Sequence, residues 1–471
     1  MVFNSLTFLV FFCVVLGLHQ LPLPWRVKKG NLLAASYLFY AAWNPIFVLL
    51  LWTSTIVDWF VAKWMVRTDG RAGKRGILLL SLVVNLGFLG YFKYGTFLLE
   101  NWAGLLKVFG LTYHPLVSPI VLPVGISFYT FETLSYTLEV YRGQVPPWDS
   151  FLDFALFVAF FPHLVAGPIV RAADFLPQCR TPRRVTAPQL GWGLSLLAFG
   201  LFEKVVVADA LLAPVADQVY SSWEKAGCFA AWIGTLAFSG QIFFDFAGYS
   251  LCAIGAALCL GFVLKDNFHL PYAAIGFSDF WRRWHLSLST WLRDYLYISL
   301  GGNRRGEVRT YVNLMLTMLI GGLWHGASWR FVVWGGLHGL YLIVERLLCQ
   351  VVGEARFLDA QPVRILLALL TYALVCVTWV FFRAEDFSSA FHLLTVMLTG
   401  GLGELSLGEA ARTVLLVTVL LLIGQWLLRD ASLEQLLGRF PWWIRSVILA
   451  GVLLALALAP GDNRAFIYFQ F

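Results

Sequence analysis

The sequence has 471 residues, of which 59% are hydrophobic and 13% are charged, and its mean hydropathy is +0.74. A soluble domain carries about 25% charged residues, so this composition excludes an ordinary soluble protein. The net charge of +7 comes from 34 Lys and Arg against 27 Asp and Glu. Because the basic residues cluster in short loops between apolar blocks, we interpret the charge as the positive-inside bias of a membrane protein and expect no nucleic acid partner.

The apolar blocks at the start of the chain predict membrane-spanning helices, since a bilayer core takes about 20 helical residues to cross. Residues 6–18 lack a basic leader and a small-residue cleavage site, so they predict a retained first helix and not a signal peptide. Two helices are expected within 31–66. The block 76–110 then leads out across the membrane, and the block 117–140 returns.

Block 151–170 is apolar but is interrupted by Pro162 and by Gly167-Pro168. It predicts a broken or re-entrant segment, which is tolerated at membrane depth only where the backbone is buried in protein or lines a wet cavity. Further spans are predicted at 187–208, 228–244, 246–264, 310–322, 330–345, 364–382, 411–428 and 443–459.

The fold class expected from these blocks is an all-α polytopic membrane protein with about 11–13 membrane-embedded helices, some of them broken. We expect one integral-membrane domain over 1–471, with core motifs in 151–345 and C-terminal helices in 364–471. Its basic loops are residues 25–30, 67–75, 180–184 and 301–309. All four are cytoplasmic if the N-terminus lies outside, which sets the predicted orientation.

Residues 265–309 are too polar for a simple span. Within them, residues 277–300 carry apolar side chains at alternating spacings of three and four, namely Trp281, Trp284, Leu288, Trp291 and Tyr295. This period predicts an amphipathic helix at a membrane interface or lining a funnel. The charged residues that fall off this apolar stripe are Arg282, Arg283, Arg293 and Asp294.

His325 lies in the motif GGLWHGASW, inside the run 310–329 that contains no Asp, Glu, Lys or Arg. An ionisable residue at membrane depth is a candidate for function. Burial disfavours the charged imidazolium, and a neutral imidazole accepts a proton from a hydroxyl, so His325 is a candidate general base. A core histidine with one hydrogen bond is the alternative. The neighbouring glycines fit either close substrate approach or tight helix packing.

Other histidines are weaker candidates for the same site. His285 lies beside Trp284 on the predicted amphipathic helix and either lines a tunnel or has a solvated tip at the interface. His163 lies in the broken block and either lines the tunnel or caps a helix end. His338 either contacts His325 locally or packs in the core.

Asp245 separates two apolar blocks, and Tyr249 follows it within one helical turn. We expect both to be tunnel candidates. A lone carboxylate in this setting needs a cationic partner, for which Arg282 and Arg283 are candidates. The alternative for Asp245 is a structural ion pair.

The remaining candidate site is a cluster of basic residues, which could form an anion-binding mouth on the cytosolic side. Its members are Arg282, Arg283, Arg304, Arg305 and Arg309. The phosphates of a nucleotide-like donor would suit such a mouth, although positive-inside usage explains the same residues. The seven cysteines show no CxxC or Cys/His ligand spacing, so no metal is expected. From the residues alone, both an enzyme and a transporter remain open.

Several motifs resemble the membrane-bound O-acyltransferase (MBOAT) family, most closely its bacterial polysaccharide O-acetylation branch of AlgI-like alginate O-acetylation proteins. They span nearly the whole chain. The motifs are MVFNSLTFLVFF, FFPHLVAGPIVRAADFLPQ, FDFAGYS, FSDFWRRWHLSLSTWLRDYLYISLGGNRRG, GGLWHGASWRFVVWGGLHG and the closing FIYFQF.

The resemblance implies an MBOAT-type funnelled helical core with a tunnel through the membrane. It implies that His325, in the WHG motif, is catalytic and that His285, in FWRRWH, is the second functional histidine. The implied donor is acetyl-CoA from the cytosol, with no permanently bound cofactor. The expected donor-binding residues are Arg282, Arg283, Trp324, Arg304 and Arg305.

The same resemblance implies a bacterial inner-membrane protein surrounded by membrane lipid. With the orientation predicted from the basic loops, its N-terminus is periplasmic. The acetyl group would reach a periplasmic SGNH-type polysaccharide acetyltransferase, which would modify an exported polysaccharide. Many members of this branch have Asp-Met where this chain has Leu251-Cys252, so we leave open whether the polymer is alginate or another exopolysaccharide.

Two alternatives remain beside acetyl transfer. D-alanyl transfer proteins (DltB-like) of the same family take their acyl group from a carrier protein. A transporter or flippase for polysaccharide or lipid precursors would fit the broken segment 151–170 and the embedded Asp245, although no inverted repeat of the two halves is evident.

Overall fold

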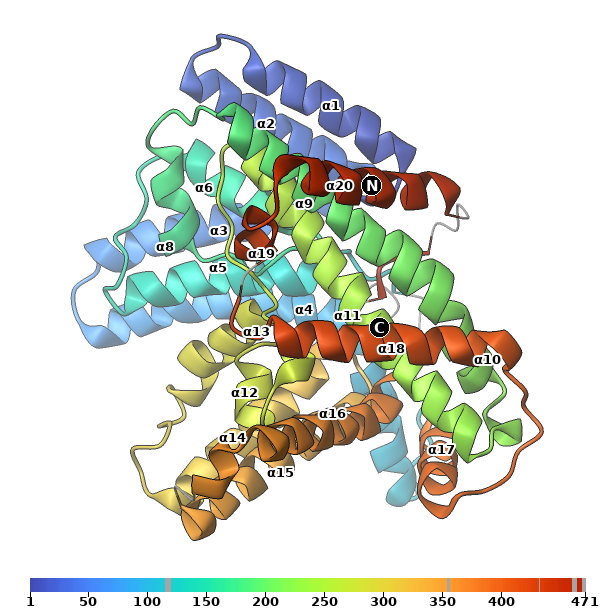
Figure 1. Ribbon diagram of the computed structural model, residues 1–471. Helices are drawn as coiled ribbons and strands as arrows, with labels where there is room; N and C mark the ends of the chain where they lie inside the picture. Colours follow the sequence, from blue (N-terminus) through green and yellow to red (C-terminus); the bar gives the residue numbers. More distant parts are fainter. Residues whose placement is uncertain (115–119, 354–355, 432, 460–463, 468–471) are drawn as a thin grey trace. The chain divides into compact units, whose positions relative to one another are not determined.

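The computed structural model describes residues 1–114, 120–353, 356–431, 433–459 and 464–467, and these residues form helices and loops without a β-strand (Figure 1). The predicted all-α architecture is therefore confirmed. Two compact units share the chain. Unit 1 contains residues 1–194, 253–265 and 326–328, and unit 2 contains residues 195–252, 266–325 and 329–471. The helices α9 (Ala187–Leu201) and α11 (Cys228–Cys259) contribute residues to both units.

Long apolar helices confirm that the protein is a multi-pass membrane protein. The described helices that are long and apolar enough to cross a bilayer are α3 (Phe47–Arg67), α4 (Arg71–Val108), α11, α15 (Trp329–Val352), α16 (Gln361–Arg383) and α18 (Gly408–Leu427). Shorter apolar helices are α1 (Leu6–Gln20), the pair α6 and α7 over Phe151–Leu164, α17 (Phe387–Thr399) and α20 (Trp442–Leu458). The number of membrane-embedded helices expected from the sequence, about 11–13, is larger than the number of long helices because it also included short and broken helices of this kind.

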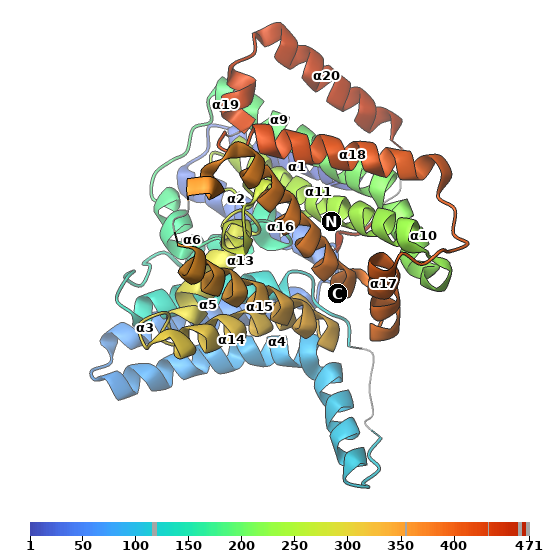
Figure 2. The same cartoon turned by 60° about the horizontal axis from the view of Figure 1, so that its bottom comes forward.

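In unit 1, helices α3, α4 and α5 (Ile126–Tyr141) lie side by side, with α2 (Trp25–Ala41) and α6 (Phe151–Ala159) packed against them. Figure 2 shows that the second half of α4 turns away from the first half. A buried carboxylate joins the helices of this group, because Asp58 on α3 accepts hydrogen bonds from Ser81 (2.6 Å) and Asn85 (2.9 Å) on α4. The first residues of the predicted span 117–140 lie outside the described residues.

The predicted break in block 151–170 is confirmed. Helix α6 ends at Ala159, Phe160 has the non-helical angles φ −57° and ψ 108°, and α7 (Phe161–Leu164) follows. Pro162 lies in the first turn of α7, where the lack of an N–H costs little but continuation of the preceding helix is blocked. His163 on α7 is fully buried in unit 1.

In unit 2, the prediction of two spans at 228–244 and 246–264 was wrong. A single helix, α11, runs through Asp245 without a break. The physical reason is that the carboxylate of Asp245 pairs with the ammonium group of Lys204 at 2.5 Å. A paired carboxylate can stay buried inside a helix bundle, so the helix does not have to end there. Lys204 lies on a π-helix, η2 (Phe202–Leu212).

Helices α14 (Glu307–His325) and α15 form a hairpin through a three-residue link, and they pack closely. A Cβ atom added to Gly322 would overlap the carbonyl oxygen of Phe331, and one added to Gly335 would overlap that of Met318. The glycines therefore allow the two backbones to touch, as in membrane helix pairs generally. For Gly322, the packing interpretation is the correct one.

The predicted amphipathic helix over 277–300 is not one helix. It is divided into α12 (Phe277–Trp281), α13 (Leu286–Trp291) and a π-helical turn, η5 (Leu292–Tyr297). The break occurs because His285 adopts the left-handed angles φ 45° and ψ 55°. The apolar stripe is not at an interface either, since Trp284 and Leu288 are 0% and 1% exposed.

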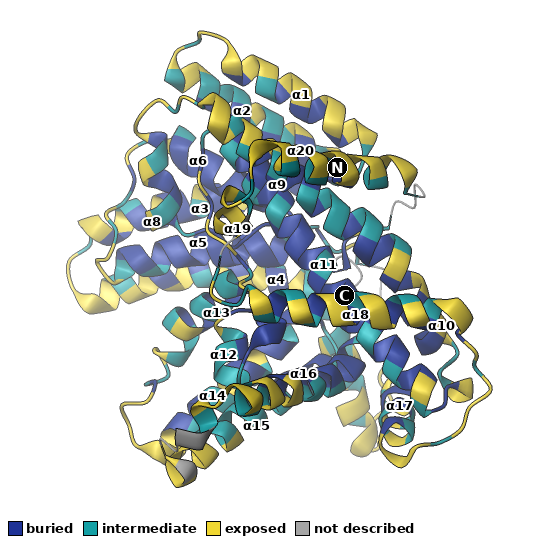
Figure 3. Cartoon of the chain, in the orientation of Figure 1, coloured by how far each residue is buried: buried dark blue, intermediate teal, exposed yellow. Residues whose placement is uncertain are grey.

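The burial pattern fits a membrane setting. Figure 3 shows α5 as almost wholly buried, whereas α4 and α18 have broad exposed faces. After its first turn and Arg412, the exposed side chains of α18 are apolar: Leu415, Leu416, Val419, Leu420, Ile423 and Leu427. Large exposed apolar faces are unusual on a soluble monomer but are expected where lipid is the solvent.

Candidate active site

Two buried histidines meet in unit 2. The ring centroids of His285 and His325 are 6.5 Å apart, and the residues are 0% and 2% exposed. His325 is the last residue of α14, and His285 lies in the break between α12 and α13. The structure thus brings together the two histidines that the sequence ranked first.

Aromatic rings enclose the histidine pair. Trp334 on α15 and Phe382 on α16 lie 4.9 and 5.5 Å from the ring of His325. Trp324 lies 5.9 Å from the ring of His285, and Phe246 on α11 lies 4.6 Å from it. The surroundings of both imidazoles are therefore apolar, and charges and hydrogen bonds act strongly there.

His285 lies outside the long membrane-spanning helices, and its burial lowers its pKa to about 3. The cause is desolvation, since an apolar environment disfavours the imidazolium. At pH 7 the imidazole is neutral and one of its nitrogens carries a lone pair, which is the state that a proton acceptor requires.

A cavity of about 880 Å³ lies in unit 2, between α12, α13, η5, α14 and α15. Leu286, which follows His285 in the chain, lines it, whereas His285 and His325 are not among its lining residues. Its charged walls include the guanidinium groups of Arg282, Arg293 and Arg346. Hydroxyl groups of Ser289, Thr290 and Tyr297 also line it. The remaining surface is largely apolar and includes Leu286, Leu292, Leu314 and Met318. The carboxylates of Asp279 and Glu345 line it as well, so the cavity combines a charged region with an apolar region.

The five arginines of the predicted basic mouth are not gathered at the cavity. Arg282 lines the cavity, whereas Arg304, Arg305 and Arg309 are exposed and are not among its lining residues. Trp324 does not line the cavity but contacts both histidines. Arg293, placed with Arg282 off the apolar stripe, is a lining residue, as is Arg346 at the end of α15.

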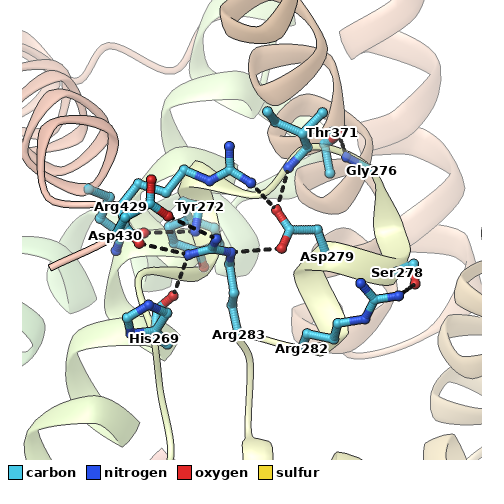
Figure 4. A network of polar contacts seen from close by, with 12 residues as sticks. His269, Tyr272, Gly276, Ser278, Asp279, Arg282, Arg283, Thr371, Arg429 and Asp430 are labelled. Carbon is cyan, nitrogen blue, oxygen red and sulfur yellow. Dashed lines mark hydrogen bonds and ion pairs between the residues drawn. The ribbon is translucent and has the colours of Figure 1, made fainter. Parts of the chain in front are cut away.

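Arg283 is not part of an anion mouth, because it is buried and already paired. Figure 4 shows the carboxylate of Asp279 between the guanidinium groups of Arg283 and Arg429. The distances are 2.9 Å to Arg283 and 2.6 Å to Arg429. Arg283 also donates to the carbonyl oxygens of His269 and Arg429. This network ties α12 to the end of α18, so the role of Arg283 is structural.

Asp245 does not pair with Arg282 or Arg283. Its partner is Lys204, which also contacts Asp209 at 2.9 Å, and all of these side chains are buried. The second oxygen of Asp245 accepts a hydrogen bond from the backbone N–H of Ile467 at 2.7 Å. The ion-pair interpretation of Asp245 is therefore the correct one.

Tyr249 packs its ring 4.6 Å from that of Phe466, which also contacts Phe246 at 5.5 Å. The first two residues of the closing FIYFQF motif thus pack into unit 2. The other four residues of this motif, 468–471, lie outside the described residues.

His163 lies in unit 1, whereas both histidines of the pair lie in unit 2. The Nε2 atom of His163 lies 3.5 Å from the carboxylate of Glu132 and 2.9 Å from the carbonyl oxygen of Phe157. His338, on α15, is fully buried and lies 3.0 Å from the hydroxyl of Thr378. For His338 the packing interpretation fits better.

Sequence reasoning missed several residues around the site. Lys204 was not linked to Asp245, and Trp334, Arg346 and Asn267 were not singled out. For Lys204 a signal existed, since a lysine in an apolar block requires a buried anion. No local pattern marks Asn267, whose partners come from other segments.

A model of the membrane-bound O-acyltransferase family matches residues 6–383. The chain belongs to this family. The predicted resemblance is thereby confirmed, and the protein is an O-acyltransferase of the MBOAT type.

This MBOAT chain is similar to three bacterial proteins. It is 44% identical over 431 residues to the probable alginate O-acetylase AlgI of Azotobacter vinelandii, covering 90% of this chain and 83% of the relative. It is 39% identical over 402 residues to the peptidoglycan O-acetyltransferase of Helicobacter pylori, covering 80% and 74%. It is 31% identical over 306 residues to the teichoic acid D-alanyltransferase of Lacticaseibacillus rhamnosus, covering 58% and 75%.

Proposed function

We propose that this O-acyltransferase takes an acetyl group from cytosolic acetyl-CoA and delivers it for the O-acetylation of an exported polysaccharide. The observation that carries the proposal is that unit 2 holds both a pair of buried histidines with apolar walls and a cavity whose lining includes three arginines. An acyl-transfer site needs a base in a dry environment and a place for an anionic donor. We assign the base to the histidine pair and the donor site to the cavity.

The cavity suits acetyl-CoA in size and in chemistry. Its volume of about 880 Å³ lies at the upper end of the range of about 300–1,000 Å³ that is typical of small-molecule sites. Guanidinium groups bind phosphates through paired N–H donors. We therefore assign Arg282, Arg293 and Arg346 to binding the phosphates at the nucleotide end of acetyl-CoA. The apolar walls then hold the pantetheine arm, with the thioester toward the histidines.

In the proposed reaction, a neutral histidine accepts the proton of the acceptor hydroxyl as its oxygen attacks the thioester carbonyl carbon. A C–O bond forms, the C–S bond breaks, and the CoA thiolate takes up a proton. The apolar walls exclude water, which would otherwise hydrolyse the donor. His325 is proposed as an essential histidine of this step, with His285 beside it.

The acceptor is proposed from the relatives, whose names refer to alginate and to peptidoglycan. Both are polysaccharides outside the cytoplasm, so the acetyl group has to cross the inner membrane. We propose a periplasmic SGNH-type acetyltransferase as the receiving partner, and a periplasmic N-terminus for this chain. Leu251 and Cys252 depart from the common Asp-Met pair of the branch, so we do not assign the polymer as alginate.

The donor assignment is tested with purified protein in proteoliposomes, radiolabelled acetyl-CoA and measurement of free CoA. We expect the wild-type protein to release CoA. Because each lining arginine holds phosphate, Arg282→Ala and Arg346→Ala should each raise the KM for acetyl-CoA by about tenfold, the worth of one charge-assisted hydrogen bond. Arg304→Ala, an exposed arginine outside the cavity, is the matched control and should behave like the wild-type protein.

D-alanyl transfer from a carrier protein is the second candidate, favoured by the teichoic acid D-alanyltransferase relative. It predicts that free acetyl-CoA is inert and that only an acylated carrier protein donates. An assay in which acetyl-CoA gives no CoA release, while an acylated carrier protein loses its acyl group, would overturn our donor assignment.

A further inference from the structure

Asn267 is a buried residue on the loop between α11 and α12, and it is 1% exposed. Its side chain and backbone both contact the break that contains His285. The backbone carbonyl oxygen accepts the N–H of Leu286 at 2.8 Å. The side-chain oxygen lies 3.3 Å from Nδ1 of His285 and also contacts Ser287.

The orientation of the Asn267 amide follows from its partners. The backbone N–H of Ser287 can only donate, and it lies 3.2 Å from the Oδ1 atom of Asn267. The amide oxygen must therefore face this segment. The opposite end of the amide, Nδ2, donates to the hydroxyl of Ser250 on α11 at 3.2 Å. Asn267 is thus fixed at both ends.

The position of the proton on His285 follows from this orientation. Since Oδ1 of Asn267 is an acceptor, Nδ1 of His285 must carry the hydrogen in the neutral ring. The Ser287 hydroxyl agrees with this, because it donates to Asn267 at 2.9 Å and so turns a lone pair toward Nδ1, 3.4 Å away. The lone pair of the imidazole then resides on Nε2.

The backbone of His285 adds a reason to expect function. Its left-handed conformation at φ 45° is rare for a residue with a side chain and costs energy. The hydrogen bond from Leu286 to Asn267 holds the backbone in this conformation, and the edge-to-face contact with Phe246 at 4.6 Å fixes the ring. Strain maintained in this way is commonly found where a side chain must be aimed.

We propose that Asn267 is a positioning residue that holds His285 in the Nδ1–H tautomer, so that Nε2 of His285 is a basic nitrogen of the acyl-transfer site. The role is that of a residue that orients a catalytic imidazole through its other nitrogen. The structural part of this proposal stands on the contacts of Asn267. Its consequence for turnover rests on the proposed acetyl transfer.

The tautomer is measured without any activity assay. The protein is labelled with ¹³C and ¹⁵N histidine and studied by solid-state NMR in lipid, and the signal of His285 is identified by its loss in His285→Gln. We expect the Nδ1–H tautomer in the wild-type protein and in Asn267→Asp, whose carboxylate accepts the same hydrogen bond. In Asn267→Ala we expect the Nε2–H tautomer or a mixture. An Nε2–H ring in the wild-type protein overturns the proposal.

Turnover gives the second arm, with acetyl-CoA as the donor. We expect Asn267→Ala to lower kcat by about 10–100-fold, with little change in the KM for acetyl-CoA, because the donor cavity is intact. Asn267→Asp should restore most of kcat. Equal losses in both variants, or a change in KM alone, would contradict a positioning role. No CoA release by the wild-type protein would count against the proposed donor, while the NMR result would still decide the role of Asn267.

Discussion

The chemistry of this protein depends on how single polar residues are maintained in apolar surroundings. His285 and His325 are enclosed by aromatic rings, whereas the buried ammonium group of Lys204 is paired with the carboxylates of Asp209 and Asp245. Removal of one partner from a buried pair leaves an uncompensated charge, which costs more than the pair itself contributes.

The first prediction concerns Lys204→Met. It leaves the carboxylates of Asp209 and Asp245 buried without their cation, and it should lower the free energy of unfolding by about 3–5 kcal/mol. Thermal unfolding in detergent measures this. Arg412→Ala removes an exposed ion pair with Glu409 and is the matched control, with an expected loss of about 0–1 kcal/mol. Equal stability of the two variants would show that Lys204 is not a buried anchor.

Single residues were predicted unevenly from the sequence. His325 was found because a charge-free run makes one ionisable residue conspicuous, and His285 was a second candidate that the family motif then supported. The partner of Asp245 was predicted incorrectly, because Lys204 and Asp245 are joined only by the packing of η2 against α11. Asn267 could not be predicted, since its importance comes from contacts with Ser250 and His285.

At the scale of elements, the spacing of apolar residues predicted which segments are helical, but it did not predict where the helices are interrupted. The period over 277–300 is real, yet His285 in its left-handed conformation divides the segment. Conversely, Asp245 was expected to separate two spans, and α11 continues through it. The break near Pro162 was predicted correctly because proline acts through local geometry.

The packing of α14 on α15 gives the second prediction. Gly322→Ala and Gly335→Ala each place a Cβ atom on the backbone of the facing helix, so each should destabilise the protein by about 1–3 kcal/mol and displace His325. Gly336→Ala is the control, since its Cβ would meet only the end of the Leu319 side chain at 3.3 Å. Unfolding temperature and CoA release measure both effects. Wild-type behaviour of Gly322→Ala would refute the close backbone contact.

At the scale of the whole molecule, composition and basic loops predicted a multi-pass protein and its orientation. The described long helices confirm the first point. The orientation remains a prediction from the positions of Lys and Arg.

The third prediction tests this orientation by thiol labelling. In a background with the exposed Cys13 and Cys349 replaced by Ser, Arg305→Cys should react with a membrane-impermeant maleimide only in inverted vesicles. Ala42→Cys, in the exposed turn between α2 and α3, should react only in right-side-out vesicles. Labelling of both positions from the same side would exclude the predicted topology.

The most direct test of the account is acetyl transfer by His325→Ala in proteoliposomes with radiolabelled acetyl-CoA on the cytoplasmic side. His114→Ala, which changes an exposed histidine in unit 1, is the matched control. We predict that the wild-type protein and the control release CoA, and that His325→Ala remains folded and releases none above background. Release of CoA by His325→Ala at the wild-type rate would contradict the assignment of the buried histidine pair as the site of acyl transfer.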